Sequence, residues 1–347
     1  MTSEVKIPIE NIYFLLCYAW NKLDEAEVVN VRSIDSPELL DLFAKVLTKG
    51  ISHLLIRGFD RNYITHEQQT HRIKGKIDFG ESLKKNLFKN ARAHCIFDEF
   101  NHNVLHNQIL KYTLRTLLRY EKLDPKISNE ISGIYKYFLE IDDIQIQKQH
   151  FNRVQLNSNN FFYDFLLKIC EIIYDFAFID EKDGKLKFRD FLRDEKKMAV
   201  LFEEFVRNFY KAELPKFYPN VKVGREDIFW DVKDDFMPKM QTDISIEFQD
   251  RKMIIDTKYY KEAMNKYFDK EKFRTQNIYQ LHAYLRNVEK KGGLNLNCDG
   301  MLLYPTVDKV IYKDGKMAEH KVYFNTINLN QNWKDISKDL IELVNVL

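Results

Sequence analysis

The fold of this chain is decided by two segments, Thr242-Asp243-Ile244-Ser245-Ile246-Glu247 and Met253-Ile254-Ile255-Asp256-Thr257-Lys258. They predict a β-hairpin that carries an acid on its first strand and an acid-x-lysine on its second. Side chains alternate between the two faces of a strand, so Asp256 and Lys258 point the same way. The apolar run at 253–255 indicates an interior strand, where an unpaired charge is costly.

The turn of this hairpin sets which residues face each other across it. A two-residue loop at Gln249-Asp250 places Asp243 directly opposite Asp256. The same register places Glu247 opposite Lys252. Opposed carboxylates repel each other unless a cation lies between them. Two acids and a lysine at one place are typical of a Mg²⁺-dependent phosphodiesterase, in which the metal activates water and the lysine steadies the developing charge.

A helix expected directly after the hairpin carries polar residues at regular spacing. It begins near Phe273, and Gln280 and Tyr284 lie four residues apart on one face. Acids and lysines also alternate on any solvent-facing strand, so the acid-x-lysine alone is a weak signal. The order of strand, acid-x-lysine strand and Q-x-x-x-Y helix, however, resembles the PD-(D/E)XK nuclease superfamily in its RecB-like variety. This resemblance implies that Gln280 and Tyr284 belong to the catalytic site.

Length and composition indicate a globular chain with two domains. The chain has 347 residues, against a prior of about 150 residues per domain. Hydrophobic residues make up 45% and aromatic residues 14%, which is enough for sizeable cores. The net charge is only +2, so a DNA-binding face must come from local clusters. Candidate clusters are Arg72 to Lys76 and the run from Lys258 to Arg274, and both also fit an ordinary solvated surface.

Several classes of site and location are not indicated. The four cysteines form no C-x-x-C, so we expect neither a zinc ribbon nor a disulfide framework, and we expect a reducing, cytoplasmic location. The N-terminus lacks a signal-peptide pattern, and the most apolar segment, residues 12–20, is too short to span a membrane and is expected to be a buried helix. The sequence contains no P-loop motif, so no nucleotide triphosphate site of that kind is expected.

The expected fold class is α/β, or α+β overall. Helical spacing of apolar residues predicts helices over about 103–120, 125–139, 161–176, 194–213, 275–288 and 333–346. Strand patterns dominate the second half, and a helix between two of its strands implies a right-handed crossover and a partly parallel sheet. The polar stretch 145–160 predicts the boundary between two domains. Residues 1–157 are expected to be mostly helical with a small β portion, and residues 158–347 to form a RecB-like nuclease domain with a central mixed sheet flanked by helices.

A second resemblance covers essentially the whole chain, in order. The opening Ile7-Pro8-Ile9-Glu10-Asn11-Ile12-Tyr13-Phe14-Leu15-Leu16-Cys17-Tyr18-Ala19-Trp20 resembles the start of the McrC family, the nuclease subunits of McrBC modification-dependent restriction systems. The resemblance continues at residues 75–79, 107–111, 242–244, 256–260 and 276–284. McrC-like subunits cleave double-stranded DNA only with McrB, an AAA+ ring that hydrolyses GTP and recognises the modified cytosine. The missing P-loop agrees with that division of labour.

The match also implies a role for each site residue. Asp243 and Asp256 would hold the metal, and Lys258 would orient water or stabilise the transition state. Glu203, on the helix before the hairpin, is a further candidate ligand, although an exposed acid on an amphipathic helix shows the same pattern. Thr242 stands where the superfamily name has a proline. Mg²⁺ is the expected cofactor and Mn²⁺ a possible substitute, because all-oxygen ligands suit hard cations.

Two other functions are left open by the sequence. One is an assembly factor that activates the motor without cutting, and the other is a stand-alone RecB-like repair nuclease. The intact acids and lysine argue against the first, and the McrC-like opening argues against the second. The N-terminal part is implied to dock into the pore of a McrB-like ring and stimulate its GTPase, through loops and strand edges before about Gln145 that include the basic strand 72–79.

Overall fold

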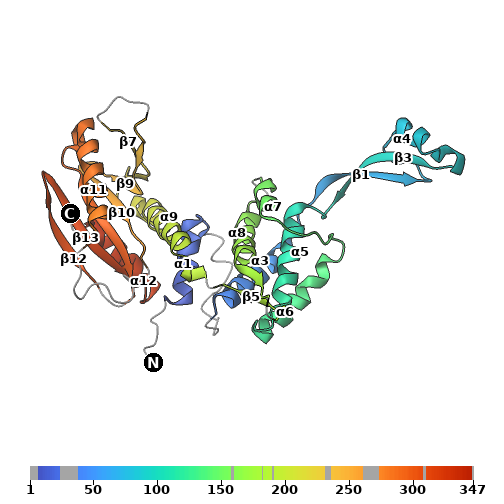
Figure 1. Ribbon diagram of the computed structural model, residues 1–347, viewed down its shortest axis with the longest axis horizontal. Coiled ribbons are helices and arrows are strands. Elements are labelled where there is room, and N and C mark those ends of the chain that lie inside the picture. Colours follow the sequence, from blue (N-terminus) through green and yellow to red (C-terminus); the bar gives the residue numbers. More distant parts are fainter. Residues whose placement is uncertain are drawn as a thin grey trace. The chain divides into compact units, whose positions relative to one another are not determined.

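The computed structural model describes residues 7–23, 38–157, 160–181, 183–189, 191–230, 236–260, 273–307 and 310–345. The chain divides into two compact units (Figure 1). The first, here called the sheet unit, comprises residues 1–34 and 190–347, and the second, here called the helical unit, comprises residues 35–189.

The sheet unit is built around a six-stranded mixed sheet with the order β12-β13-β11-β10-β9-β6. Its strands are β6 (Lys222–Gly224), β9 (Ile244–Glu247), β10 (Lys252–Thr257), β11 (Asp299–Thr306), β12 (Tyr312–Met317) and β13 (His320–Asn328). A separate pair, β7 (Asp227–Ile228) and β8 (Met240–Gln241), leads into β9. β11 pairs in parallel with both β10 and β13, whereas the other neighbours are antiparallel. The expected mixed sheet is confirmed.

β9 and β10 form the predicted hairpin in the predicted register. Glu247 pairs with Lys252, and the backbone N–H of Phe248 donates to the carbonyl of Arg251 at 2.9 Å, which leaves a two-residue loop. One further step along this register places Asp243 opposite Asp256. Every residue of β10 is buried, as expected for a strand between two neighbours.

The helices in the described part of the sheet unit are α1 (Ile9–Ala19), α9 (Glu195–Glu213), α11 (Thr275–Val288) and α12 (Trp333–Asn345). α11 makes the crossover between the parallel strands β10 and β11, and Leu281 and Leu285 pack on Ile254 in one buried cluster. The helix lies so close to β11 that a Cβ on Gly300 would come 2.8 Å from Leu285 Cδ1. None of the helices in the described parts of the chain has the length and hydrophobicity that a bilayer crossing requires.

The N-terminal helix α1 belongs to the sheet unit, not to the domain of residues 1–157 in which the sequence places it. It packs along α9, and its buried Asn11 amide donates to the carbonyls of Leu329 and Gln331, each at 2.8 Å. Phe14 stacks on Trp333 of α12, with ring centroids 4.7 Å apart. The prediction that residues 12–20 form a buried helix is confirmed.

The helical unit contains α3 (Leu39–Arg57), α5 (Leu105–Leu118), α6 (Pro125–Tyr135), α7 (Lys148–Arg153) and α8 (Phe162–Phe176), followed by the pair β4 (Ala177–Ile179) and β5 (Leu186–Phe188). The predicted boundary after residue 157 therefore falls inside this unit, between α7 and α8. The physical reason is that α8 buries its apolar face against α3 and α5, so the polar stretch before it is a surface connection within one core.

A three-stranded ribbon belongs to the same unit and is here called the arm, residues 62–101. Its strands are β1 (Asn62–Thr70), β2 (Lys76–Ile77) and β3 (Ala93–Asn101), in the order β1-β3-β2. Figure 1 shows the helix α4 (Phe79–Lys84) at the end of this ribbon that lies away from α5. Gly75 adopts a φ of +60°, and a Cβ there would lie 2.4 Å from the carbonyl oxygen of Ile96, so the approach to β3 requires glycine.

The attachment of α1 to the sheet unit can be tested by Asn11→Ala. We expect a loss of about 1–3 kcal/mol in the free energy of unfolding, because two buried carbonyls lose their donor. Chemical denaturation of the full chain measures it. Asn287→Ala is the control, since the Asn287 amide donates to Ala283 one turn earlier in its own helix. Equal effects of the two substitutions would contradict the role assigned to Asn11.

Candidate active site

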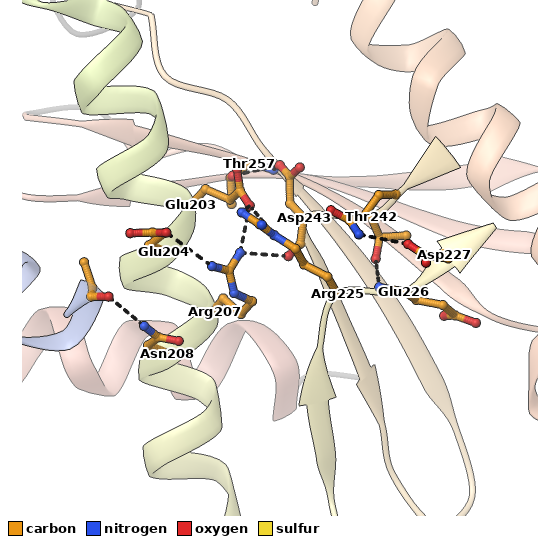
Figure 2. Close-up of polar contacts among 12 residues, drawn as sticks. Glu203, Glu204, Arg207, Asn208, Arg225, Glu226, Asp227, Thr242, Asp243 and Thr257 are labelled. Carbon is orange, nitrogen blue, oxygen red and sulfur yellow. Dashed lines mark hydrogen bonds and ion pairs between the residues drawn. The ribbon is translucent and has the colours of Figure 1, made fainter. Parts of the chain in front are cut away.

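The site forms where Asp243, just before β9, meets the end of β10. Asp243 Oδ2 accepts hydrogen bonds from the backbone N–H of Thr257 at 2.8 Å and from its hydroxyl at 2.9 Å. Figure 2 shows this carboxylate next to Thr257. The two bonds hold Asp243 beside the strand that carries Asp256, so the sequence prediction that these acids converge is consistent with the geometry.

Asp256 is fully buried. Among the described residues, its one ion pair is with Lys258. The Lys258 ammonium lies 2.7 Å from Asp256 Oδ2 as an ion pair. Apart from this ammonium, no donor in the described part of the chain reaches either carboxylate oxygen of Asp256. A buried carboxylate with a single donor is costly as an anion. These oxygens therefore have lone pairs available for a cation.

The two acids carry raised pKa values. Burial, with a smaller contribution from the charge of Asp243, raises the pKa of Asp256 to about 7, although Lys258 opposes this rise. Burial and then the nearby charge of Glu203 raise the pKa of Asp243. Like charges held close together in a poorly solvated place have this effect, and a divalent cation between them would reverse it.

Glu203 reaches the site from α9, but two arginines hold its carboxylate. Glu203 Oε1 accepts from Arg207 at 2.7 Å and from Arg225 Nε at 3.0 Å (Figure 2). Arg207 also donates to the backbone carbonyl of Asp243 at 3.5 Å, which ties α9 to the strand. Sequence reasoning missed both arginines. Arg207 lies one helical turn after Glu203 and could have been noticed, whereas nothing in the sequence points to Arg225.

The donor set fits a hard divalent cation. Mg²⁺ is commonly bound by one or two carboxylates, with waters and substrate phosphates completing its shell. Asp243 and Asp256 supply that number. Within the described ranges, no group of three or more Asp, Glu, His and Cys side chains has the spacing of a metal site. The role of Glu203 as a third ligand therefore stays a prediction.

Gln280 and Tyr284 lie next to the site and bond to each other. The Gln280 amide donates to the Tyr284 hydroxyl at 2.7 Å, and that hydroxyl donates to the carbonyl of Gln241 at 2.9 Å. Gln241 stands two residues before Asp243, so this chain of bonds ties α11 to the segment that presents the acid. These contacts support a positioning role, and the predicted catalytic role of both residues stays a prediction.

Thr242, in the place of the superfamily's proline, has a structural use of its own. Its backbone N–H donates to the Glu226 carbonyl, and its hydroxyl accepts from the Glu226 N–H, each at 2.9 Å. Proline could make neither bond. The pair of bonds fixes the backbone directly before Asp243, so the departure from the motif does not loosen the site.

Of the basic run from Lys258 to Arg274, residues 261–272 lie outside the described residues.

Comparisons with known proteins identify related sequences and a related fold. A family model described as McrBC 5-methylcytosine restriction system component matches residues 10–305. The chain is 32% identical over 343 residues to the type IV methyl-directed restriction enzyme EcoKMcrBC of Escherichia coli K12, with 97% of each protein covered. It is also similar to a chain in the refined half-complex from the tetradecameric assembly of Thermococcus gammatolerans McrB AAA+ hexamers with bound McrC. The TM-score between the two chains is 0.59 and their sequence identity is 15%, and the match covers 98% of this chain and 76% of the Thermococcus chain. The structural likeness supports the fold alone.

The raised pKa of Asp256 predicts how stability of the metal-free protein depends on pH. The ordinary pKa is 3.8 and the folded value about 7, so the folded state binds this proton more tightly. The resulting stabilisation is complete below the ordinary pKa and is lost as the pH rises through about 7. In EDTA, Asp256→Asn should therefore match the wild type near pH 4 and exceed its free energy of unfolding at pH 8, by on the order of 1–4 kcal/mol.

Denaturant unfolding at both pH values measures this difference. Asp314→Asn, which removes an exposed acid on β12, controls for the loss of one negative charge. A gain in stability for Asp256→Asn that is the same at both pH values would show that burial of this charge is not the cause.

Proposed function

Because the chain belongs to the McrBC 5-methylcytosine restriction system component family, we propose that it is the DNA-cleaving subunit of a GTP-dependent restriction complex directed to modified cytosine. The observation that carries this proposal is the carboxylate pair Asp243 and Asp256 with Lys258 beside it. The reaction is hydrolysis of a phosphodiester bond in double-stranded DNA.

The residues divide the chemistry among them. Asp243 and Asp256 would hold Mg²⁺, which when bound supplies an activated water and neutralises charge on the phosphate. Lys258, whose ammonium lies 2.7 Å from Asp256, would orient the attacking water and stabilise negative charge as it develops. The Thr257 donors and the Gln280–Tyr284 pair keep Asp243 in position. Burial of the site limits competition from bulk water for these charges.

The partner proposed for this chain is a McrB-like AAA+ GTPase ring. The structural relative is a chain from an assembly of McrB AAA+ hexamers with bound McrC, and the present sequence carries no P-loop with which to drive a motor itself. The arm supports this proposal by its surface. Ile73, Phe79 and Leu83 are 70%, 62% and 64% exposed, next to the exposed Arg72, Lys74 and Lys76. Apolar side chains left in solvent beside one sign of charge are typical of a surface that meets a partner.

The two alternatives are less well supported. A non-cleaving activator would have no need of the buried Asp256 and the partly buried Asp243, whose raised pKa values show that their charges destabilise the fold without a cation. A stand-alone repair nuclease would not account for a family match that covers residues 10–305.

Substitution of the site residues should abolish cleavage. Asp256→Ala or Lys258→Ala should lower the rate of DNA cleavage on the order of a thousandfold, the equivalent of about 4 kcal/mol, while stimulation of the partner's GTPase is retained. The assay uses the full chain with its McrB-like partner, GTP, methylated DNA and Mg²⁺. EDTA should abolish wild-type cleavage, and either Mg²⁺ or Mn²⁺ should restore it.

Asp314→Ala, on the exposed face of β12, is the matched control and should cut at the wild-type rate. Near wild-type cleavage by either site variant, or full wild-type activity in EDTA, would refute the assignment. Stimulation of the GTPase without any cleavage by the wild-type protein would favour the activator.

A second prediction tests the arm. The triple variant Arg72→Gln, Lys74→Gln and Lys76→Gln should weaken stimulation of the partner's GTPase about tenfold or more, because about 1.4 kcal/mol of binding free energy corresponds to a factor of ten. DNA cleavage should fall in parallel, since it depends on the partner. GTP turnover at increasing concentrations of the variant measures the change.

The control is Lys313→Gln, Lys316→Gln and Lys321→Gln, which removes the same charge from exposed positions of β12 and β13 in the sheet unit. Equal loss in both triple variants would point to a general charge effect, and unchanged stimulation by the arm variant would move the contact elsewhere.

A further inference from the structure

A cavity of about 410 Å³ opens between the first turns of α9 and the segment that directly follows β10 and Lys258. Its lining residues are Glu195, Lys196, Ala199, Tyr259, Tyr260 and Arg274. Tyr259 and Tyr260 directly follow Lys258 in the chain. Ala199 and Lys196 precede Glu203 by four and seven residues, so they share its face of α9, about 6 and 10 Å along the helix axis. The cavity therefore continues the site along one helix face.

Arg274 is held at this cavity by a chain of contacts that begins in the core. Its guanidinium lies over the Tyr260 ring, 3.9 Å from the centroid. The Tyr260 hydroxyl donates to Asn277 Oδ1 at 3.0 Å, and the Asn277 amide donates to the Tyr304 hydroxyl at 3.2 Å. Asn277 and Tyr304 are both buried. A guanidinium stacked on a ring that the core fixes in this way loses little side-chain entropy when it binds an anion.

The charge of the cavity favours an anion. In the described part of the chain, neither Arg274 nor Lys196 lies within 4 Å of a carboxylate oxygen, whereas Glu195 is the one acid in the lining. Both basic side chains are exposed. Two cations that form no ion pair with a described acid, next to two aromatic rings, have the chemistry that binds a phosphate together with its sugar or base.

We propose that this cavity binds a flanking phosphate of the DNA strand that is cut, and this inference rests on the proposed nuclease function. Successive nucleotides rise about 3.4 Å along a strand, so a cavity about 6–10 Å from Glu203 along α9 corresponds to a phosphate roughly two to three nucleotides away from the scissile one. Arg274 and Lys196 contact its oxygens, and Tyr260 acts as a positioning residue for Arg274. Anchored there, the strand presents its neighbouring phosphodiester to Asp243 and Asp256.

Arg274→Gln in the full chain tests the proposal. With the partner, GTP and Mg²⁺, the KM for DNA should rise about tenfold, the equivalent of about 1.4 kcal/mol, while kcat stays within about threefold. In EDTA, where no cleavage occurs, the slope of log K against log salt concentration for DNA binding should fall by about 1, because one phosphate contact is lost. Tyr260→Ala should raise KM similarly, and Tyr260→Phe, which keeps the ring, should recover most of the loss.

Arg286→Gln is the matched control, because Arg286 is a half-exposed arginine on the same helix that pairs with Glu289 at 2.7 Å. Its KM and salt slope should equal those of the wild type. An unchanged KM and slope in Arg274→Gln, an equal change in Arg286→Gln, or a loss confined to kcat would each overturn the proposal. If the wild-type complex failed to cut DNA but Arg274→Gln still lowered the salt slope, the proposed nuclease function would fail and the phosphate site would stand.

Discussion

The antiparallel pairing of β9 with β10 is the interaction on which the site depends. A β-strand repeats every two residues, so a slip of one position would turn Asp243 or Asp256 to the opposite face. The two-residue loop between Phe248 and Arg251 sets this register, and the bonds from Thr257 to the Asp243 carboxylate extend it one step past the end of the ladder. Burial of β10 between β9 and β11 then prevents the strand from moving.

This arrangement places a carboxylate in the protein interior, where its charge lowers the stability of the fold. Among the described residues, Lys258 is the one donor that reaches the buried carboxylate of Asp256, and Asp243 and Glu203 add like charge nearby. A core built only for stability would place apolar side chains here, because a buried carboxylate is costly. Such a cost is typical of functional sites, where a substrate or a cation completes the charge balance. The two arginines around Glu203 offset part of the repulsion, and they do so without occupying the oxygens of Asp256.

The division of the chain into units follows from where apolar faces are covered. α1 comes first in the sequence, yet it covers α9 and bonds to the segment after β13, so the sheet unit is assembled from both ends of the chain. The helical unit is inserted between them, with the arm as its own extension. An insertion of this kind lets one continuous chain carry the proposed cleavage site and the proposed partner surface on separate units, each with its own core.

The sequence by itself determined the local elements and the central pair of acids. The periodicity of apolar residues predicted α5, α8, α9, α11 and α12 within a few residues, because helical spacing and turn residues act over short distances. Hairpin register is local too, so the opposition of Asp243 and Asp256 followed from loop length alone.

The tertiary structure decided what depends on contacts between distant segments. α1 joined the sheet unit and the boundary at 157 moved, because only packing shows which core a helix covers. Lys252 lies opposite Glu247 as the sequence predicted, but its ammonium is buried and pairs with Glu226 at 2.7 Å. Sequence reasoning missed Arg225 because it lies 22 residues from Glu203 in the chain. A contact over that separation depends on the tertiary fold and produces no periodic pattern in the sequence.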